Sequence, residues 1–222
     1  MNISTYDVWL YVHILLFVYW LGADLGVYYA AKYVARADLS MDERMRFLDL
    51  TLLLDMGPRT GLVLIFPAGL QLSAIVGLAR TPEPVVRAAW IGFVAWLALV
   101  WVQHWLVPKP LGETLRRVDL SIRYLVIALM LGLGGWSLYR GTPFITDWLA
   151  LKVLLYGCVI AAGVYLRSII AAWGTGFKLY ADGQQQQANE LIAAAQRKGE
   201  FGAYVLWLLV AAIAFLGVAK PF

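Results

Sequence analysis

The sequence has few charged residues. Only 14% of its 222 residues are Asp, Glu, Lys or Arg, whereas soluble domains carry about 25%. Hydrophobic residues make up 62% of the chain, which excludes an ordinary soluble domain and predicts an integral membrane protein. We therefore interpret the net charge of +4 as loop charge that orients the chain in a lipid bilayer, and we expect no nucleic-acid partner.

Cysteine and recognisable catalytic motifs are also scarce. Cys158 is the single cysteine, which excludes an intramolecular disulfide. The sequence contains no Walker loop and no His-Glu-x-x-His motif, so the phosphate-binding and zinc-protease classes that these motifs define are excluded. No Lys or Arg precedes the first apolar run, and we expect this run to be retained as a membrane span.

Long apolar runs separated by polar connections predict an all-α fold, a polytopic membrane helical bundle that forms a single transmembrane domain over residues 1–222. About six transmembrane helices are expected, at 6–31, 47–78, 86–107, 120–139, 144–180 and 201–219.

Three local patterns refine this prediction. Pro58 and Pro67 fall in the second span and are expected to bend it or break it near its start. The polar stretch 182–200 is expected to form a short helical hairpin in the cytosol. The run Gly132-Leu-Gly-Gly-Trp136 is typical of a close helix-packing surface.

Basic residues are distributed unevenly among the connections. Those after spans two and four contain only Arg80, Arg87 and Arg140. The connections after spans one, three and five contain the larger group: Lys32, Arg36, Arg44, Arg46, Lys109, Arg116, Arg117, Lys178, Arg197 and Lys198. The positive-inside rule then predicts that these three connections are cytoplasmic and that both termini lie outside.

His13 is the most informative side chain, because it is one of two histidines and lies within an uninterrupted apolar run. An ionisable group at this depth suggests a function, and imidazole is a common metal and haem ligand. The structural alternative is a neutral histidine that forms a hydrogen bond with a carbonyl or hydroxyl group.

His104 is expected near the opposite side of the membrane. Helical rise places the two histidines roughly 15 Å apart along the normal of a core about 30 Å thick. Two axial ligands of one iron must approach within about 4 Å, given metal–imidazole bonds near 2 Å. This separation argues against one haem shared by His13 and His104.

A second polar cluster is expected toward the cytoplasmic side, formed by Asp24, Asp55, Arg59 and His104. Asp55 and Arg59 have i, i+4 spacing and can pair on one helix face, so a structural role in neutralising charge is one interpretation. A proton or ion path is the other, because transporters line such paths with these groups.

Four features together resemble the HemJ-type protoporphyrinogen oxidases and the related CopD-like membrane proteins. They are His13 followed by an aromatic-rich helix to Gly22, Pro58 near the start of the next span, Trp148-Leu-Ala-Leu-Lys152, and the ending Val218-Ala-Lys-Pro-Phe222. The resemblance covers spans one, two, five and six, with spans three and four as an insertion. Asp24-Leu-Gly26 stands where the family has a basic residue, and the family's second histidine is replaced at Ala150 or Leu151.

The resemblance implies a multi-pass protein of the bacterial inner membrane that binds haem b and works in redox or porphyrin handling, with an oxidoreductase activity like that of protoporphyrinogen oxidase. His13 would be the axial ligand of the metal, Lys152 would contact a porphyrin propionate, and Trp20 would belong to the apolar wall. A porphyrin or quinone-type substrate and a homo-oligomer or membrane complex are the expected partners. The alternatives are a small transporter that uses the polar cluster, and an assembly subunit without chemistry.

Overall fold

The computed structural model describes residues 3–106 and 110–221, and helices dominate both parts. In chain order the helices described there are α1 (Thr5–Val34), α2 (Met41–Leu54), α3 (Met56–Ile75), α4 (Glu83–Leu106), α5 (Pro110–Arg140), α6 (Asp147–Ala181) and α7 (Gln185–Ala219). Six segments are long and apolar enough to cross a membrane, with α2 and α3 together forming one of them. The predicted all-α membrane bundle is confirmed.

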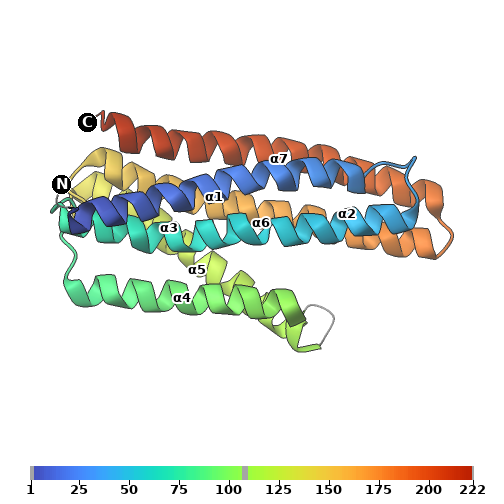
Figure 1. Ribbon diagram of the computed structural model, residues 1–222, viewed down its shortest axis with the longest axis horizontal. Coiled ribbons are helices and arrows are strands. Elements are labelled where there is room, and N and C mark those ends of the chain that lie inside the picture. The colour runs from blue at the N-terminus through green and yellow to red at the C-terminus, as the bar shows by residue number, and fades with distance from the viewer. Residues whose placement is uncertain (1–2, 107–109, 222) are drawn as a thin grey trace.

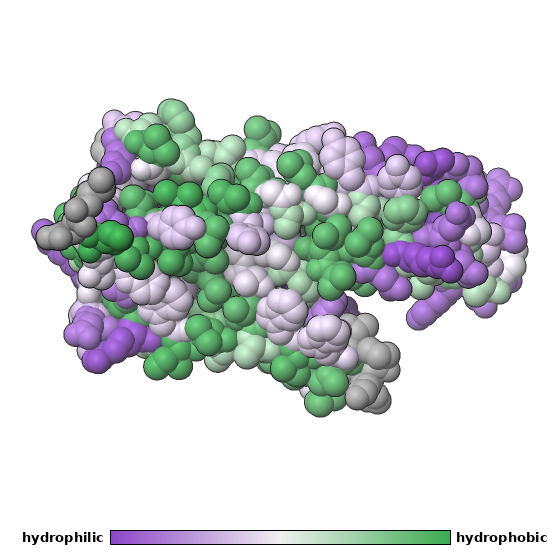
Figure 2. All heavy atoms as spheres, viewed as in Figure 1, coloured by the Kyte–Doolittle hydropathy of each residue, from purple (hydrophilic) through white to green (hydrophobic). Residues whose placement is uncertain are grey.

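The helices lie side by side along the long axis of the molecule, and both termini lie at the same end (Figure 1). We call this end, where α1 begins and α7 ends, the terminal end. The opposite end, which holds the α1–α2 and α6–α7 connections, is called the loop end. Hydrophilic side chains gather at the loop end, whereas hydrophobic ones cover much of the remaining length (Figure 2).

The second expected span is divided at Asp55, between α2 and α3. Pro58 has no backbone N–H to donate to the carbonyl of Leu54, four residues earlier, so the helix is weakest at this point. Pro67 lies within α3, which continues past it. The expected break near the start of the span is therefore present, and the more central proline is accommodated.

Two helices begin at least ten residues before the expected spans. α5 starts at Pro110 instead of 120, and α7 starts at Gln185 instead of 201. The stretch 182–200 is therefore not a separate hairpin: most of it forms the first turns of α7, after a tight turn in which Gly183 has a φ of 83°. The hydrophobic pattern marks where a helix enters the bilayer, whereas the helix itself extends into its polar, helix-forming flank.

Glycines allow two helix pairs to approach closely. A Cβ on Gly61 of α3 would lie 2.8 Å from the Cβ of Trp20 on α1, and one on Gly134 of α5 would lie 2.6 Å from the backbone nitrogen of Leu154 on α6. A Cβ on Gly132 or on Gly135 would instead lie in open space. Within the run 132–136, Gly134 is therefore the residue that allows close packing.

We expect Gly134→Ala to destabilise the protein by about 1–3 kcal/mol, because the new methyl group would force α5 and α6 apart. Gly135→Ala is the matched control and should leave stability nearly unchanged. Thermal unfolding of both variants in detergent measures the difference, and equal midpoints would contradict the close crossing at Gly134.

Candidate functional site

Two cavities lie end to end along the space enclosed by α1, α3, α6 and α7. The one toward the terminal end is called the histidine cavity, because His13 lines it, and has a volume of about 490 Å³. The one toward the loop end is called the aspartate cavity, because Asp24 and Asp55 line it, and has a volume of about 140 Å³. Trp20 lines both.

One face of α1 runs along both cavities. Its lining residues succeed one another at intervals of three and four, the spacing of neighbours on one helix face. From the terminal end they include Tyr6, Leu10, His13, Phe17, Trp20, Asp24, Val27 and Ala31. The helix is therefore oriented with His13 and Asp24 facing the inside of the bundle, as the cost of exposing ionisable groups to lipid requires.

The imidazole of His13 packs against Gly69 of α3. A Cβ at Gly69 would lie 3.0 Å from Cε1 of His13, so a glycine at this point leaves room for the ring. Nδ1 of His13 is buried and forms no hydrogen bond with any described residue, although the backbone of Ile65 also lies beside the ring. The structure thus places an imidazole with an unused nitrogen at the wall of an apolar cavity.

Two lysines line the same cavity beside Trp148. Nζ of Lys152 lies 5.9 Å from the centroid of the Trp148 ring, and Nζ of Lys220 lies 6.0 Å from it. A Cβ on Gly217 of α7 would lie 2.6 Å from Nζ of Lys152, so this glycine leaves room for the ammonium group. Neither lysine forms a salt bridge within the described residues, and no Asp or Glu is among the described residues that line the cavity. The cavity therefore has a net positive lining.

Two connections shape the opening of the histidine cavity at the terminal end. The α3–α4 and α5–α6 connections pair through an isolated bridge between Ala79 and Phe144. Backbone hydrogen bonds from Arg80 to the Pro143 carbonyl (2.8 Å) and from Ile145 to the Leu78 carbonyl (3.1 Å) flank this bridge. Leu78 and Phe144 line the cavity, so these bonds fix one side of its opening.

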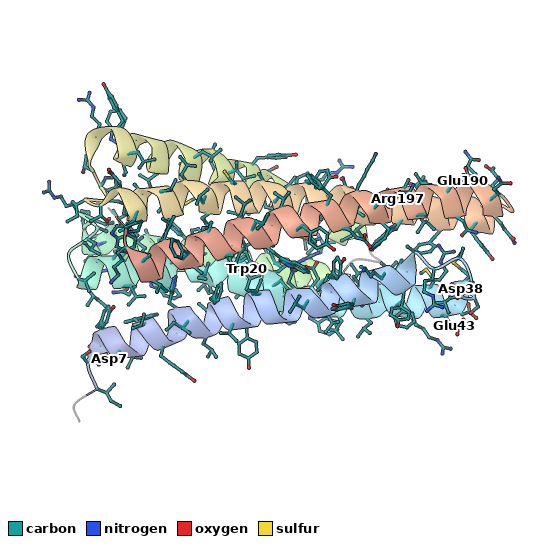
Figure 3. The ribbon with its side chains drawn as sticks, turned by 90° about the horizontal axis from the view of Figure 1, so that it is seen from above. Asp7, Trp20, Asp38, Glu43, Glu190 and Arg197 are labelled. Atoms are coloured by element: carbon teal, nitrogen blue, oxygen red, sulfur yellow. The ribbon has the colours of Figure 1, made fainter. Side chains whose placement is uncertain are left out.

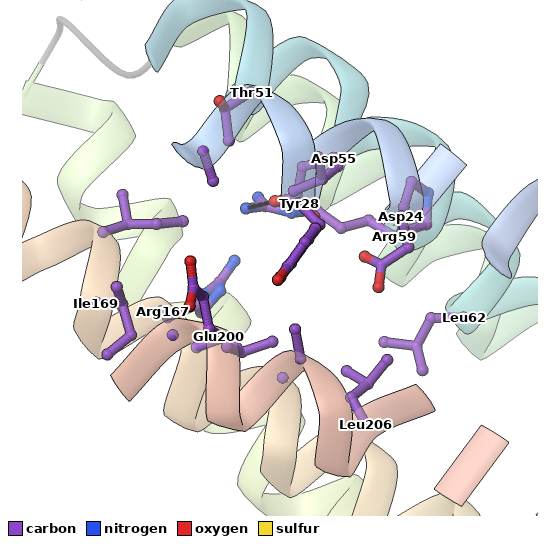
Figure 4. Close-up of a pocket in the computed structure, with 18 of the residues that line it drawn as sticks. Asp24, Tyr28, Thr51, Asp55, Arg59, Leu62, Arg167, Ile169, Glu200 and Leu206 are labelled. Atoms are coloured by element: carbon purple, nitrogen blue, oxygen red, sulfur yellow. Dashed lines mark hydrogen bonds and ion pairs between the residues drawn. The ribbon is translucent and has the colours of Figure 1, made fainter. Parts of the chain in front are cut away.

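The aspartate cavity brings together Asp24, Asp55 and Arg59, as Figure 4 shows. Arg59 pairs with Asp55 on the same helical face, which is the partner that the i, i+4 spacing predicts. Arg123, Arg167 and Glu200 also line the cavity. A cavity within the membrane-spanning part of the bundle thus has six ionisable side chains on its walls.

A buried ion-pair network holds two of these arginines. Asp119 is fully buried, and its carboxylate accepts hydrogen bonds from Nε of Arg123 (3.1 Å) and from the indole N–H of Trp96 (2.8 Å). The guanidinium of Arg167 lies 2.6 Å from the same carboxylate. One carboxylate therefore joins α4, α5 and α6 and partly neutralises two guanidinium groups.

Asp24 has a different environment. Its carboxylate accepts a 2.6 Å hydrogen bond from the indole N–H of Trp207 on α7, and no Lys, Arg or His of the described chain lies within ion-pair distance of it. Glu200, by contrast, lies 3.9 Å from Nζ of Lys32. Asp24 is thus the carboxylate of this cavity that lacks a cationic partner among the described residues.

The structure does not bring His104 into this cluster. His104 lies on α4, where its ring contacts Trp105 and Trp101 at centroid distances of 5.3 and 6.5 Å, and it lines neither cavity. Conversely, the sequence-based candidates include neither Asp119 nor Arg123. Asp119 lies just before the expected span 120–139, whereas Arg123 lies within it and is not recognised as a candidate. Their i, i+4 spacing is the signal that predicts the pair once both residues are placed on one helix.

Comparison with protein-family models, with curated proteins and with solved structures finds no match to this chain. Within residues 3–106 and 110–221, no group of three or more His, Cys, Asp or Glu side chains is arranged to hold a metal ion. His13, Trp20 and Lys152 nevertheless line one cavity together. The two cavities are therefore the features of the structure that bear on function.

We expect Asp119→Asn to destabilise the protein by about 3–5 kcal/mol, because it leaves Arg123 and Arg167 buried without an anionic partner. Glu113→Gln is the control: it removes the pairs of Glu113 with Arg116 and Arg117, which are exposed to solvent and contribute little to stability. Thermal unfolding in detergent compares the two variants. A stability of Asp119→Asn equal to that of Glu113→Gln would show that the network is not structural.

Proposed function

We propose that the histidine cavity binds an anionic, largely apolar ligand of the porphyrin class, and that the protein works in redox or porphyrin handling. One observation carries this proposal. Within the described residues, an imidazole whose Nδ1 has no hydrogen-bond partner and two lysines without a salt bridge line an apolar cavity that has no carboxylate in its wall. The volume of about 490 Å³ lies in the range of roughly 300–1,000 Å³ that is typical of small-molecule sites. Porphyrins combine an apolar ring with carboxylates, which matches this lining.

The same residues fit haem b. His13 would hold the iron through an imidazole nitrogen, while Lys152 and Lys220 would hold the propionates by charge-assisted hydrogen bonds. Trp148 and Trp20 would exclude water from the ring. When bound, haem would supply one-electron redox chemistry, whose potential depends on its axial ligand and apolar surroundings. Gly69 and Gly217 would keep the space that His13 and Lys152 occupy.

We further propose that the loop end faces the cytoplasm of a bacterial cell and that both termini lie outside the inner membrane. The loop end carries basic residues on its α1, α2, α6 and α7 segments, among them Lys32, Arg36, Arg46, Lys178 and Lys198. The positive-inside rule supports this orientation. The histidine cavity would then open toward the outer side.

A titration with two porphyrins tests the proposal. Purified protein in detergent should bind both haem and metal-free protoporphyrin, with a shifted Soret band for haem. His13→Ala should weaken haem binding by about tenfold or more, a change of only about 1.4 kcal/mol in binding free energy. Metal-free protoporphyrin should be affected much less, because it has no iron for His13 to ligate.

Lys152→Gln should weaken the binding of both porphyrins by about tenfold, because a hydrogen bond to a charged group contributes about 1.5–3 kcal/mol. Lys198→Gln, at the loop end, is the matched control and should change neither affinity. A wild-type protein that binds neither porphyrin would overturn the proposal. If His13→Ala lost the same amount of affinity for both porphyrins, the role of His13 as iron ligand would be overturned.

We propose proton or ion movement through the membrane as a second candidate function. The observation that favours it is the aspartate cavity, which places Asp24, Asp55 and Arg59 around one space among membrane-spanning helices. Such residues inside a bundle are typical of ion and proton paths.

For this second candidate, we expect wild-type proteoliposomes to show a proton flux above that of protein-free vesicles. Asp55→Asn should abolish this flux while leaving the protein folded, because it removes the charge paired with Arg59 in the cavity wall. A pH-sensitive dye inside the vesicles measures the rate. An unchanged rate in Asp55→Asn would remove Asp55 from the path.

A further inference from the structure

We propose that the two cavities are the two halves of one proton route, with Trp20 as the barrier between them. Asp24 would be the proton acceptor on the loop-end side, and the histidine cavity would continue the route beyond Trp20. This inference rests on the second candidate function and names its transported species, its carrier residue and its barrier.

Geometry is the first support. The α1 face that lines both cavities runs from Tyr6 to Ala31, which is about 38 Å at 1.5 Å per residue. The hydrocarbon core of a bilayer is only about 30 Å thick. The same four helices enclose both cavities, so the two spaces together extend through the full depth of a membrane.

Trp20 is the residue that separates them. It lies about midway along α1, between Asp7 at the terminal end and Asp38 and Glu43 at the loop end (Figure 3). Its side chain is only 5% exposed and packs where Gly61 allows α3 to approach α1 closely. Leu62 and Leu206, also buried, are apolar residues in the wall of the aspartate cavity. Hydrophobic constrictions of this kind gate pores by excluding water.

The charge arrangement assigns proton carriage to Asp24. Facing its cavity are Asp55 and Arg59 from the α2–α3 segment, Arg123 from α5, Arg167 from α6, and Glu200 from α7. Arg59 is paired with Asp55, and both Arg123 and Arg167 are paired with Asp119. Asp24 has an indole N–H as its hydrogen-bond donor and no cationic partner among the described residues. Asp24 can therefore bind and release a proton without breaking an ion pair.

Beyond Trp20, the histidine cavity continues the route toward the terminal end. Phe17 lines it on the same α1 face that carries Asp24.

Cysteine labelling tests the two-cavity arrangement without altering Trp20. Cys158→Ser gives a cysteine-free background, because Cys158 is the single cysteine. Phe17→Cys should react with a charged, membrane-impermeant thiol reagent only from the terminal-end side of sealed, ligand-free vesicles. Val27→Cys should react only from the loop-end side. Val18→Cys, 54% exposed on the lipid-facing side of α1, is the matched control and should react from neither side.

Proton flux tests the barrier and the carrier. In proteoliposomes with an imposed pH gradient, Trp20→Ala should raise the rate several-fold above wild type, and Trp20→Phe should raise it less. Adding Asp24→Asn to Trp20→Ala should remove the gain. Trp136→Ala, at a tryptophan 53% exposed on α5, is the control and should leave the rate unchanged.

The inference is overturned if Phe17→Cys and Val27→Cys react from the same side, or if either fails to react. It is also overturned if a folded Trp20→Ala conducts no faster than wild type, or if Asp24→Asn leaves its gain intact. An Asp55→Asn variant with wild-type flux overturns only the role of Asp55 in the second candidate function. Porphyrin titration of the same preparations reports separately on the first proposal.

Discussion

The carboxylate of Asp119 is the contact on which the charge arrangement of the bundle depends. It accepts hydrogen bonds from the indole of Trp96 and from Arg123, and it pairs with Arg167, so it joins α4, α5 and α6 at one buried point. Two guanidinium groups in a bilayer would otherwise lack an anion. Because both arginines are paired with Asp119, and Arg59 is paired with Asp55, Asp24 remains the cavity carboxylate without a cationic partner among the described residues. The structural network thereby leaves free the carboxylate that the proposed proton route would use.

Glycines and the large side chains opposite them determine where the interior of the bundle is closed and where it is open. Gly61 brings α3 against α1 beside Trp20, and the two helices close the space there with an aromatic side chain. Toward the terminal end, Gly69 and Gly217 leave room for His13 and Lys152, and the space widens into the histidine cavity. A glycine opposite a large side chain therefore has two different effects. It lets α1 and α3 close together at Trp20, and it leaves room for the side chains of His13 and Lys152 in the histidine cavity.

Much of the fold follows from the sequence, because a bilayer imposes a minimum apolar length on each span. The six spans and the break near Pro58 are readable from hydropathy and from proline chemistry alone. Helix ends in water are less constrained, and the early starts of α5 and α7 are consequently missed. The shared cavity of His13 and Lys152 could be expected, since both lie in the same half of the membrane. The position of His104 outside the aspartate cavity could not be predicted. It depends on the rotation and placement of α4, which are set by packing between helices and leave no trace in hydropathy.

The two proposals meet in the histidine cavity. A porphyrin bound there would fill the space through which a proton would leave. Ligand binding and proton passage would then compete for one cavity, whose lysines favour an anionic ligand. The aspartate cavity would remain accessible from the loop end in either state, because Trp20 separates it from the ligand. The proposed route from Asp24 past Trp20 into the histidine cavity can therefore be complete only in the ligand-free protein, and the bound ligand would block it.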